Sequence, residues 1–193
     1  LSTARWAASG GGTETAAWFS GGKTGSYPGT STTATENYNG SSWSTGDALN
    51  TARWMSGGVG PQTAAMVIGE RPSPGPGRGG NTEVYNGTAW AETADLATAR
   101  VQFKGAAGTS AGSFVAGGSV PPSTNATEEF NKSTNVVTAA AWASGENLPT
   151  ATKDLAGAGL QTAALAFGGK IAPGPVVASS YSYDGSSWTA TPS

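Results

Sequence analysis

Short β-prone runs alternate with stretches rich in Gly, Pro and Ser along the chain. In the first part of the sequence these runs cover residues 5–12, 15–20, 35–38 and 42–45. Each run has the length of a strand, and the glycines and prolines cluster between the runs, where turns are expected. The pattern predicts four short strands, called a, b, c and d here in chain order, and an all-β fold.

The same order of runs occurs four times. A leucine opens each unit and a tryptophan closes it, at Leu1 and Trp43, Leu49 and Trp90, Leu96 and Trp142, and Leu148 and Trp188. The units cover residues 1–48, 49–95, 96–147 and 148–193, which leaves no room for a separate domain. A period of this length is typical of the four-stranded repeats of propeller folds.

Glycine pairs and aromatic spacings make the pattern more specific. Strand b ends in a Gly pair at residues 21–22, 117–118 and 168–169. In three units, Tyr38, Tyr85 or Tyr183 of strand c precedes the closing Trp by five residues. This pattern resembles the kelch repeat of β-propellers. The resemblance implies one four-bladed kelch-like β-propeller, whose four-stranded antiparallel blades are built from consecutive strands with no strand exchanged at ring closure.

Two features are predicted to hold the ring together. The strand-a residues are small, which suits a tight ring of four inner strands, and side-chain packing of the fourth blade on the first is expected to close it. The repeated tryptophans are predicted to fill the wedges between blades as core aromatics: Trp43, Trp90, Trp142 and Trp188. Alternatively, the four units are a segment of a longer propeller or of a larger chain. Because the chain starts at Leu1 with no signal-peptide pattern, we expect a processed or excised piece.

Arginine and glutamate recur together in three units and are lost together in the fourth. The predicted pairs are Arg5 with Glu36, Arg53 with Glu83, and Arg100 with Glu128. The fourth unit has Thr152 and Tyr181 at the matching positions. Joint loss is expected of a buried ion pair, because one partner left alone would be an uncompensated buried charge. We therefore predict a structural ion pair in each of the first three blades.

Composition excludes several classes of function. The net charge is −2 and the basic residues are scattered, so we expect no nucleic-acid partner. No apolar run is long enough to span a bilayer, so no membrane insertion is expected. The chain has no Cys and no His, which removes thiolate and His-dependent catalysis, and we expect neither a cofactor nor a metal. The G-x-S-x-G sequence at residues 108–112 therefore lacks the His base of a nucleophile elbow.

The long loops between strands b and c differ in every unit. In such a blade these loops leave on one face, and variable loops on a rigid scaffold are where binding surfaces are usually built. The loop side chains best suited to contact sugar hydroxyls or acidic groups are Tyr27, Arg71, Arg78 and Lys170. They are the predicted ligand-binding residues, and solvated connectors are the alternative reading of these loops.

The repeats also carry a second resemblance. The sequences Leu-x-Thr-Ala-Arg at Leu49 and Gln-Thr-Ala-Ala at Gln62 look like degenerate kelch repeats of phage virion proteins and bacterial surface proteins. This resemblance implies a non-catalytic recognition or structural module, outside the cell or on a virion surface. We expect a phage tail-fibre or capsid-decoration part that contacts host glycan or neighbouring protein subunits. A polysaccharide hydrolase or lyase using loop carboxylates, and a protein–protein adaptor, are the alternatives.

Overall fold

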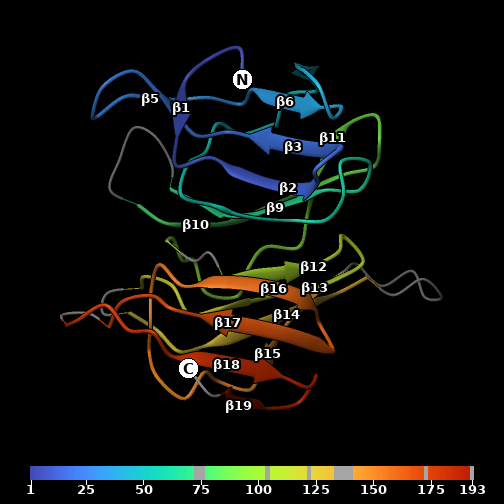
Figure 1. Cartoon of the computed structure of the whole chain (residues 1–193). Coiled ribbons are helices and arrows are strands. Elements are labelled where there is room, and N and C mark those ends of the chain that lie inside the picture. Colours follow the sequence, from blue (N-terminus) through green and yellow to red (C-terminus); the bar gives the residue numbers. More distant parts are fainter. Residues whose placement is uncertain (72–76, 103–104, 121–122, 133–140, 172–173, 192–193) are drawn as a thin grey trace.

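The protein is built from β-strands. The computed structural model describes residues 1–193 except 72–76, 103–104, 121–122, 133–140, 172–173 and 192–193. The described residues form nineteen strands and no helix, and the strands make five antiparallel sheets (Figure 1). The all-β prediction is confirmed. In the same residues, no helix has the length and apolar character needed to cross a membrane.

Four of the sheets have four strands each, and each sheet lies within one sequence unit. Sheet 1 is β2 (Ser9–Thr13), β3 (Ala16–Ser20), β6 (Thr35–Tyr38) and β7 (Trp43–Gly46), and sheet 2 is β8 (Gly57–Val59), β9 (Met66–Glu70), β10 (Gly79–Tyr85) and β11 (Trp90–Thr93). Sheet 3 is β12 (Gly105–Gly108), β13 (Gly112–Ala116), β14 (Thr127–Asn131) and β15 (Ala141–Gly145), and sheet 4 is β16 (Ala156–Leu160), β17 (Ala163–Phe167), β18 (Ser180–Tyr183) and β19 (Trp188–Thr191). Each of these four sheets therefore follows the chain order a, b, c, d.

The fifth sheet differs from the expectation of four sheets. It has three strands, β1 (Arg5–Trp6), β4 (Lys23–Thr24) and β5 (Thr30–Ser31). The prediction of one strand over residues 5–12 is wrong, because Ala7 has a φ of 54° and ends β1 before β2 begins. In the other units the matching residues form isolated bridges, such as Trp54 with Arg71. The fifth sheet is therefore a local extension of the first unit.

Tight turns join strands c and d in units one, two and four, where Asn or Asp is followed by Gly. Asn39 Oδ1 accepts hydrogen bonds from the backbone N–H groups of Ser41 and Ser42, and Gly40 has a φ of 94°. Asp184 makes the same turn in the fourth unit, where hydrogen bonds from Ser187 and Ser186 lower its pKa to about 2. In these turns only the glycine has positive φ, because the Asx side chain closes the turn by accepting backbone hydrogen bonds.

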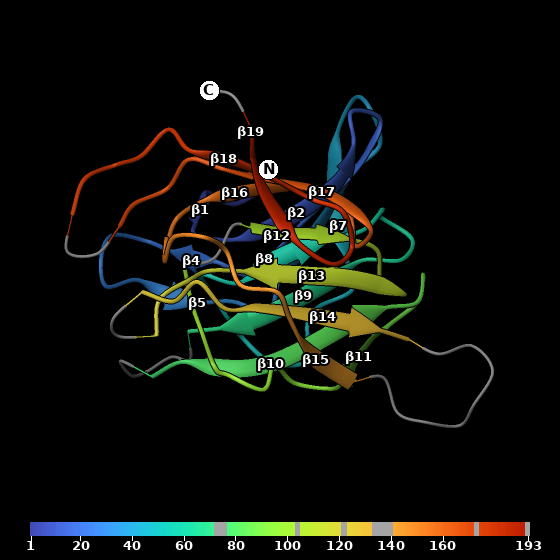
Figure 2. The ribbon, with the colours of Figure 1, turned by 90° about the horizontal axis from the view of Figure 1, so that it is seen from below.

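Neighbouring sheets pack in chain order through apolar side chains. The inner strands lie side by side, β2 with β8, β8 with β12, and β12 with β16 (Figure 2). A separate cluster of buried side chains fills each of the three spaces. Their central members are Trp18, Val67 and Trp90 between sheets 1 and 2, Met66, Ile68, Val115 and Phe130 between sheets 2 and 3, and Phe114, Ala166 and Trp188 between sheets 3 and 4. The three joints have the same construction.

The predicted core tryptophans divide into three groups. Trp90 and Trp188 are 7% and 8% exposed and fill the spaces between sheets. Trp43 is only half-buried, so its prediction as a core residue is wrong: within the described part of the chain no sheet packs over this face of sheet 1. The backbone of Trp142 lies in β15, and its side chain is outside the described residues.

Packing of the fourth unit on the first, which was expected to close a ring, is not found in the described residues. Leu165 and Phe167 of sheet 4 are 46% and 45% exposed on the face that would make this contact. Small strand-a side chains allow the inner strands to approach, but they do not by themselves bring the two ends of the array together.

Candidate functional site

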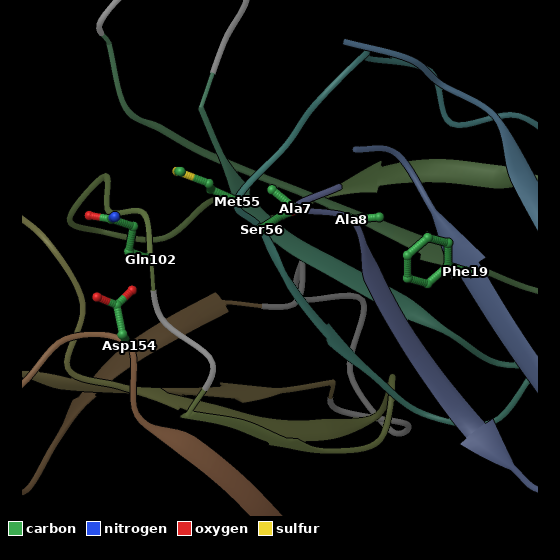
Figure 3. A pocket seen from close by; sticks show the side chains of 7 residues that line it. All are labelled: Ala7, Ala8, Phe19, Met55, Ser56, Gln102 and Asp154. Carbon is green, nitrogen blue, oxygen red and sulfur yellow. The ribbon is translucent and has the colours of Figure 1, made fainter. Parts of the chain in front are cut away.

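A pocket of about 370 Å³ opens at the start of the inner strands. Its lining comes from all four units (Figure 3): Ala7, Ala8, Phe19, Met55, Ser56, Gln102 and Asp154. In Figure 3 the Asp154 carboxylate is directed towards Gln102, and the Phe19 ring lies on the other side of the group. The pocket thus offers hydrogen-bonding groups on one side and an aromatic ring on the other.

One residue of each unit lines this pocket in the left-handed backbone conformation. These are Ala7, Met55, Gln102 and Asp154, with φ between 54° and 57°, and they are the non-glycine residues of positive φ among the described residues. Met55 N–H donates to the Ala7 carbonyl at 2.9 Å, Gln102 N–H to Met55 at 3.4 Å, and Asp154 N–H to Gln102 at 2.9 Å. Non-glycine residues in this conformation are strained, and such strain clusters at binding sites.

Beside the pocket, the residues that precede Ala7 and Met55 form an aromatic cluster with two cations. The Trp6 and Trp54 rings meet edge to face, with centroids 5.3 Å apart. Lys23 Nζ lies 4.4 Å and Arg71 Cζ 5.1 Å from the centroid of the Trp54 ring. Cations over an indole are attracted to its negative face, so this packing holds both basic side chains in place.

The Lys23 ammonium group is itself buried. The residue is 6% exposed, and Nζ donates to the carbonyls of Pro28 at 2.6 Å and Gly29 at 3.2 Å. These bonds fix the loop that carries Tyr27. Tyr27 is 84% exposed, and its ring lies 6.3 Å from that of Trp6. A fixed loop thus presents an aromatic ring to solvent next to a second aromatic ring.

Trp54 also has an unused donor. The residue is 5% exposed, and its Nε1–H has no hydrogen-bond partner within the described part of the chain. Most buried polar groups are paired, so an orphan donor in a cluster of this kind is unusual. The Nε1–H of Trp54 is thus a buried donor left unsatisfied within the cluster.

The structure brings together two of the four predicted ligand-binding residues. Tyr27 and Arg71 both belong to the cluster around Trp6 and Trp54. Arg78 lies apart, where its Nε donates to the Ser119 carbonyl at 3.0 Å. Lys170 is exposed in the fourth unit and exchanges backbone hydrogen bonds with Lys153.

These basic residues nevertheless follow one repeat pattern. Lys23, Arg71, Ser119 and Lys170 each pair with the residue that directly precedes a pocket residue. Where the third unit has Ser119, the Arg78 side chain binds its carbonyl. A basic residue therefore pairs beside a pocket residue in units one, two and four, and Arg78 of the second unit reaches the matching position of the third. The chain has ten basic residues, and this arrangement was missed because the cations come from different loop positions.

In the second unit, Glu70 replaces the second glycine of the pair that ends strand b in the other three units. It is 5% exposed, and its Oε2 has no hydrogen bond within the described residues. Arg53 Nε is 3.9 Å away. Burial raises the pKa of Glu70, and the attraction to Arg53 opposes this only in part. One carboxylate oxygen of Glu70 is thus buried without a hydrogen-bond partner among the described residues.

The structure places each predicted arginine against its glutamate. Arg5 Nη2 lies 2.8 Å from Glu36 Oε1, and the Arg53–Glu83 and Arg100–Glu128 pairs are in direct contact. The side chains of all three pairs are 5% exposed or less. The pairs tie strand c to the residues that precede strand a. Their burial leaves them no access to a ligand in the pocket.

Comparison with known proteins adds no family to this picture. Neither the protein-family models nor the curated proteins match this chain. The site is therefore interpreted from its geometry alone. In the described residues, no group of three or more Asp or Glu side chains is arranged to hold a metal ion. The groups available on the pocket face are aromatic rings, cations, an amide and one carboxylate.

Proposed function

We propose that the four sheets are blades of a kelch-like β-propeller, and that the face carrying the pocket is a non-catalytic site for carbohydrate. We further propose that the module acts outside a cell or on a virion surface, as part of a tail fibre or a similar particle. The observation that carries the binding proposal is the pair Tyr27 and Trp6, held beside the pocket by a loop that Lys23 fixes.

The chemistry of a sugar matches this arrangement. A pyranose ring has apolar C–H faces that pack on aromatic rings and hydroxyl groups that need hydrogen-bond partners. Ligand sites generally combine an apolar wall with a few placed polar groups. Here the pocket lining supplies Phe19 as the apolar wall and Gln102 and Asp154 as the polar groups. The rings of Trp6 and Tyr27 lie next to each other close by.

The cations favour a sugar that carries acidic groups. Lys153 and Lys170 lie at the fourth unit and Arg71 at the second, so positive charge flanks the pocket on more than one side. A carboxylate or sulfate group would pair with a guanidinium through charge-assisted hydrogen bonds. Binding to such a sugar should weaken as salt screens the charges.

A glycan array that holds neutral and acidic members of each sugar class tests the proposal. We expect binding to acidic glycans, with about tenfold loss for Tyr27→Ala and for Arg71→Ala, equivalent to about 1.4 kcal/mol each. Lys132→Ala is the control, because Lys132 is an exposed cation that follows strand c, away from the b–c loops. No binding by the folded chain, or equal loss for Lys132→Ala, would contradict the proposal.

A further inference from the structure

The array of sheets has two ends that differ from its interior. Each of the three joints packs one face of a sheet against the opposite face of the next. Among the described residues, sheets 2 and 3 are covered on both faces in this way, whereas sheets 1 and 4 each pack face to face on one four-stranded sheet. One face of each end sheet is therefore left over.

The bare face of sheet 4 exposes strand-b side chains whose counterparts in the other three sheets are buried. Trp18, Met66, Phe114 and Leu165 occupy the same register position against strand a. The first three are 2%, 0% and 0% exposed, and Leu165 is 46% exposed.

The next position on the same face repeats the contrast. Ser20, Ile68 and Ala116 are each 0% exposed, and Phe167 is 45% exposed. The face that packs on the following sheet in units one to three is thus open to solvent in the fourth, although it carries large apolar side chains.

Sheet 1 is bare on the complementary face. Val67, Val115 and Ala166 pack against the preceding sheet and are 1% exposed or less. Phe19, at the matching position, is only half-buried. Trp43, which corresponds to the buried Trp90, is half-buried as well and packs on Phe19 at 6.5 Å between centroids.

We propose that these two faces bind each other in a second copy of this chain, so that sheet 4 of one copy packs on sheet 1 of the next. The two bare faces match the two halves of the joint between neighbouring sheets, which the chain already makes three times. Packing of one bare face on the other would therefore continue the same interface between copies. Leu165 and Phe167 supply the apolar side chains of one half. Phe19 and Trp43 supply those of the other.

The joint between copies is head to tail. A contact between two different surfaces generates a closed ring when the rotation per copy allows it, and a longer filament when it does not. Either product requires both faces in every interior copy. The proposal does not rest on carbohydrate binding, because it is argued from the faces of the end sheets. The two sites share Phe19, which lines the pocket and also lies on the bare face of sheet 1.

Sedimentation velocity of the whole chain over a wide concentration range tests the proposal. We expect species of two or more copies in the unmodified protein. Leu165→Asp should leave a monomer because it places a charge in the joint on sheet 4, and Ala17→Asp should do so from sheet 1. Both side chains are partly exposed in the single copy, and circular dichroism should show that both variants fold.

Mixing the two variants gives the sharpest result. Each retains one working face, so the mixture should form a dimer of one copy of each and no larger species. Val176→Asp is the matched control, since Val176 is 80% exposed in a loop outside both faces, and its assembly should be unchanged. A monomer at all concentrations, or assembly that survives both substitutions, would overturn the proposal and indicate another occupant of the two faces.

Discussion

The buried pair of Arg53 and Glu83 offers the most direct test of how the sheets are held together. Both side chains are 0% exposed. Glu83 also accepts hydrogen bonds from the backbone N–H groups of Asn50 at 2.7 Å and Thr51 at 3.1 Å. Arg53 Nη1 donates to the Asn81 carbonyl at 2.8 Å. The pair therefore joins the start of the second unit to strand β10.

Removal of one partner should destabilise the fold strongly. In Arg53→Met the Glu83 carboxylate stays buried without its counter-charge, for which we expect a loss of about 3–5 kcal/mol in the free energy of unfolding. The backbone donors that remain on Glu83 place the value at the lower end of this range. In Glu83→Gln the guanidinium is left buried, and we expect a loss of similar size.

The fourth unit supplies the compensated variant. Thr152 and Tyr181 replace the pair there, and Tyr181 Oη donates to Thr150 Oγ1 or accepts from it at 3.4 Å. The double variant Arg53→Thr with Glu83→Tyr should therefore lose clearly less than the sum of its two single variants, by about 1–3 kcal/mol of coupling.

Urea denaturation followed by both tryptophan fluorescence and circular dichroism measures these values. The two transitions should coincide, which is the condition for quoting one free energy of unfolding. The reasoning is refuted if Arg53→Met costs less than about 1 kcal/mol, the range of an exposed pair. Strict additivity of the double variant would equally refute it.

Two further predictions concern other buried positions. Burial raises the pKa of Glu70 above its value in the unfolded chain, so the folded protein loses stability as the pH rises from the unfolded-state pKa through the folded-state pKa. Glu70→Gln should therefore be more stable than the unmodified chain at pH 7 and equally stable below about pH 4. Thermal melts that show the same difference in stability at both pH values would argue against this. At Gly117, with a φ of 68°, an added Cβ would lie 2.5 Å from the Thr152 carbonyl, whereas at Gly25, with a φ of 77°, it would meet nothing within 4 Å. Gly117→Ala should thus cost about 3 kcal/mol or more in urea denaturation and Gly25→Ala about 1 kcal/mol, and equal costs would show that backbone strain alone decides both.

Sequence patterns predicted the repeated elements well because each depends on local chemistry. The turn at Asn39 and Gly40 requires a short polar side chain and a residue free to adopt positive φ, and both are visible in one unit. Arg53 and Glu83 were paired because a buried charge and its partner are lost together. In each case the repeats supplied the comparison.

The pocket could not be predicted in the same way. Ala7, Met55, Gln102 and Asp154 share a left-handed backbone conformation that is uncommon for Ala, Met and Gln and somewhat less so for Asp. Main-chain hydrogen bonds between units join these four residues. The sequence of a single unit does not reveal those hydrogen bonds. The role of Trp54 was missed for a similar reason, since Lys23 and Arg71 approach its ring from two different loops.

The hydrogen bonds that connect Ala7, Met55, Gln102 and Asp154 are made entirely by the main chain. The four side chains are therefore not needed to hold the inner strands in position, and they differ in size, polarity and charge while the backbone path stays the same. A substitution at one of these sites changes one wall of the pocket and leaves the connections between sheets intact. The array thus separates the main-chain connections, which stay constant, from four sites at which the shape and polarity of the pocket can change one residue at a time.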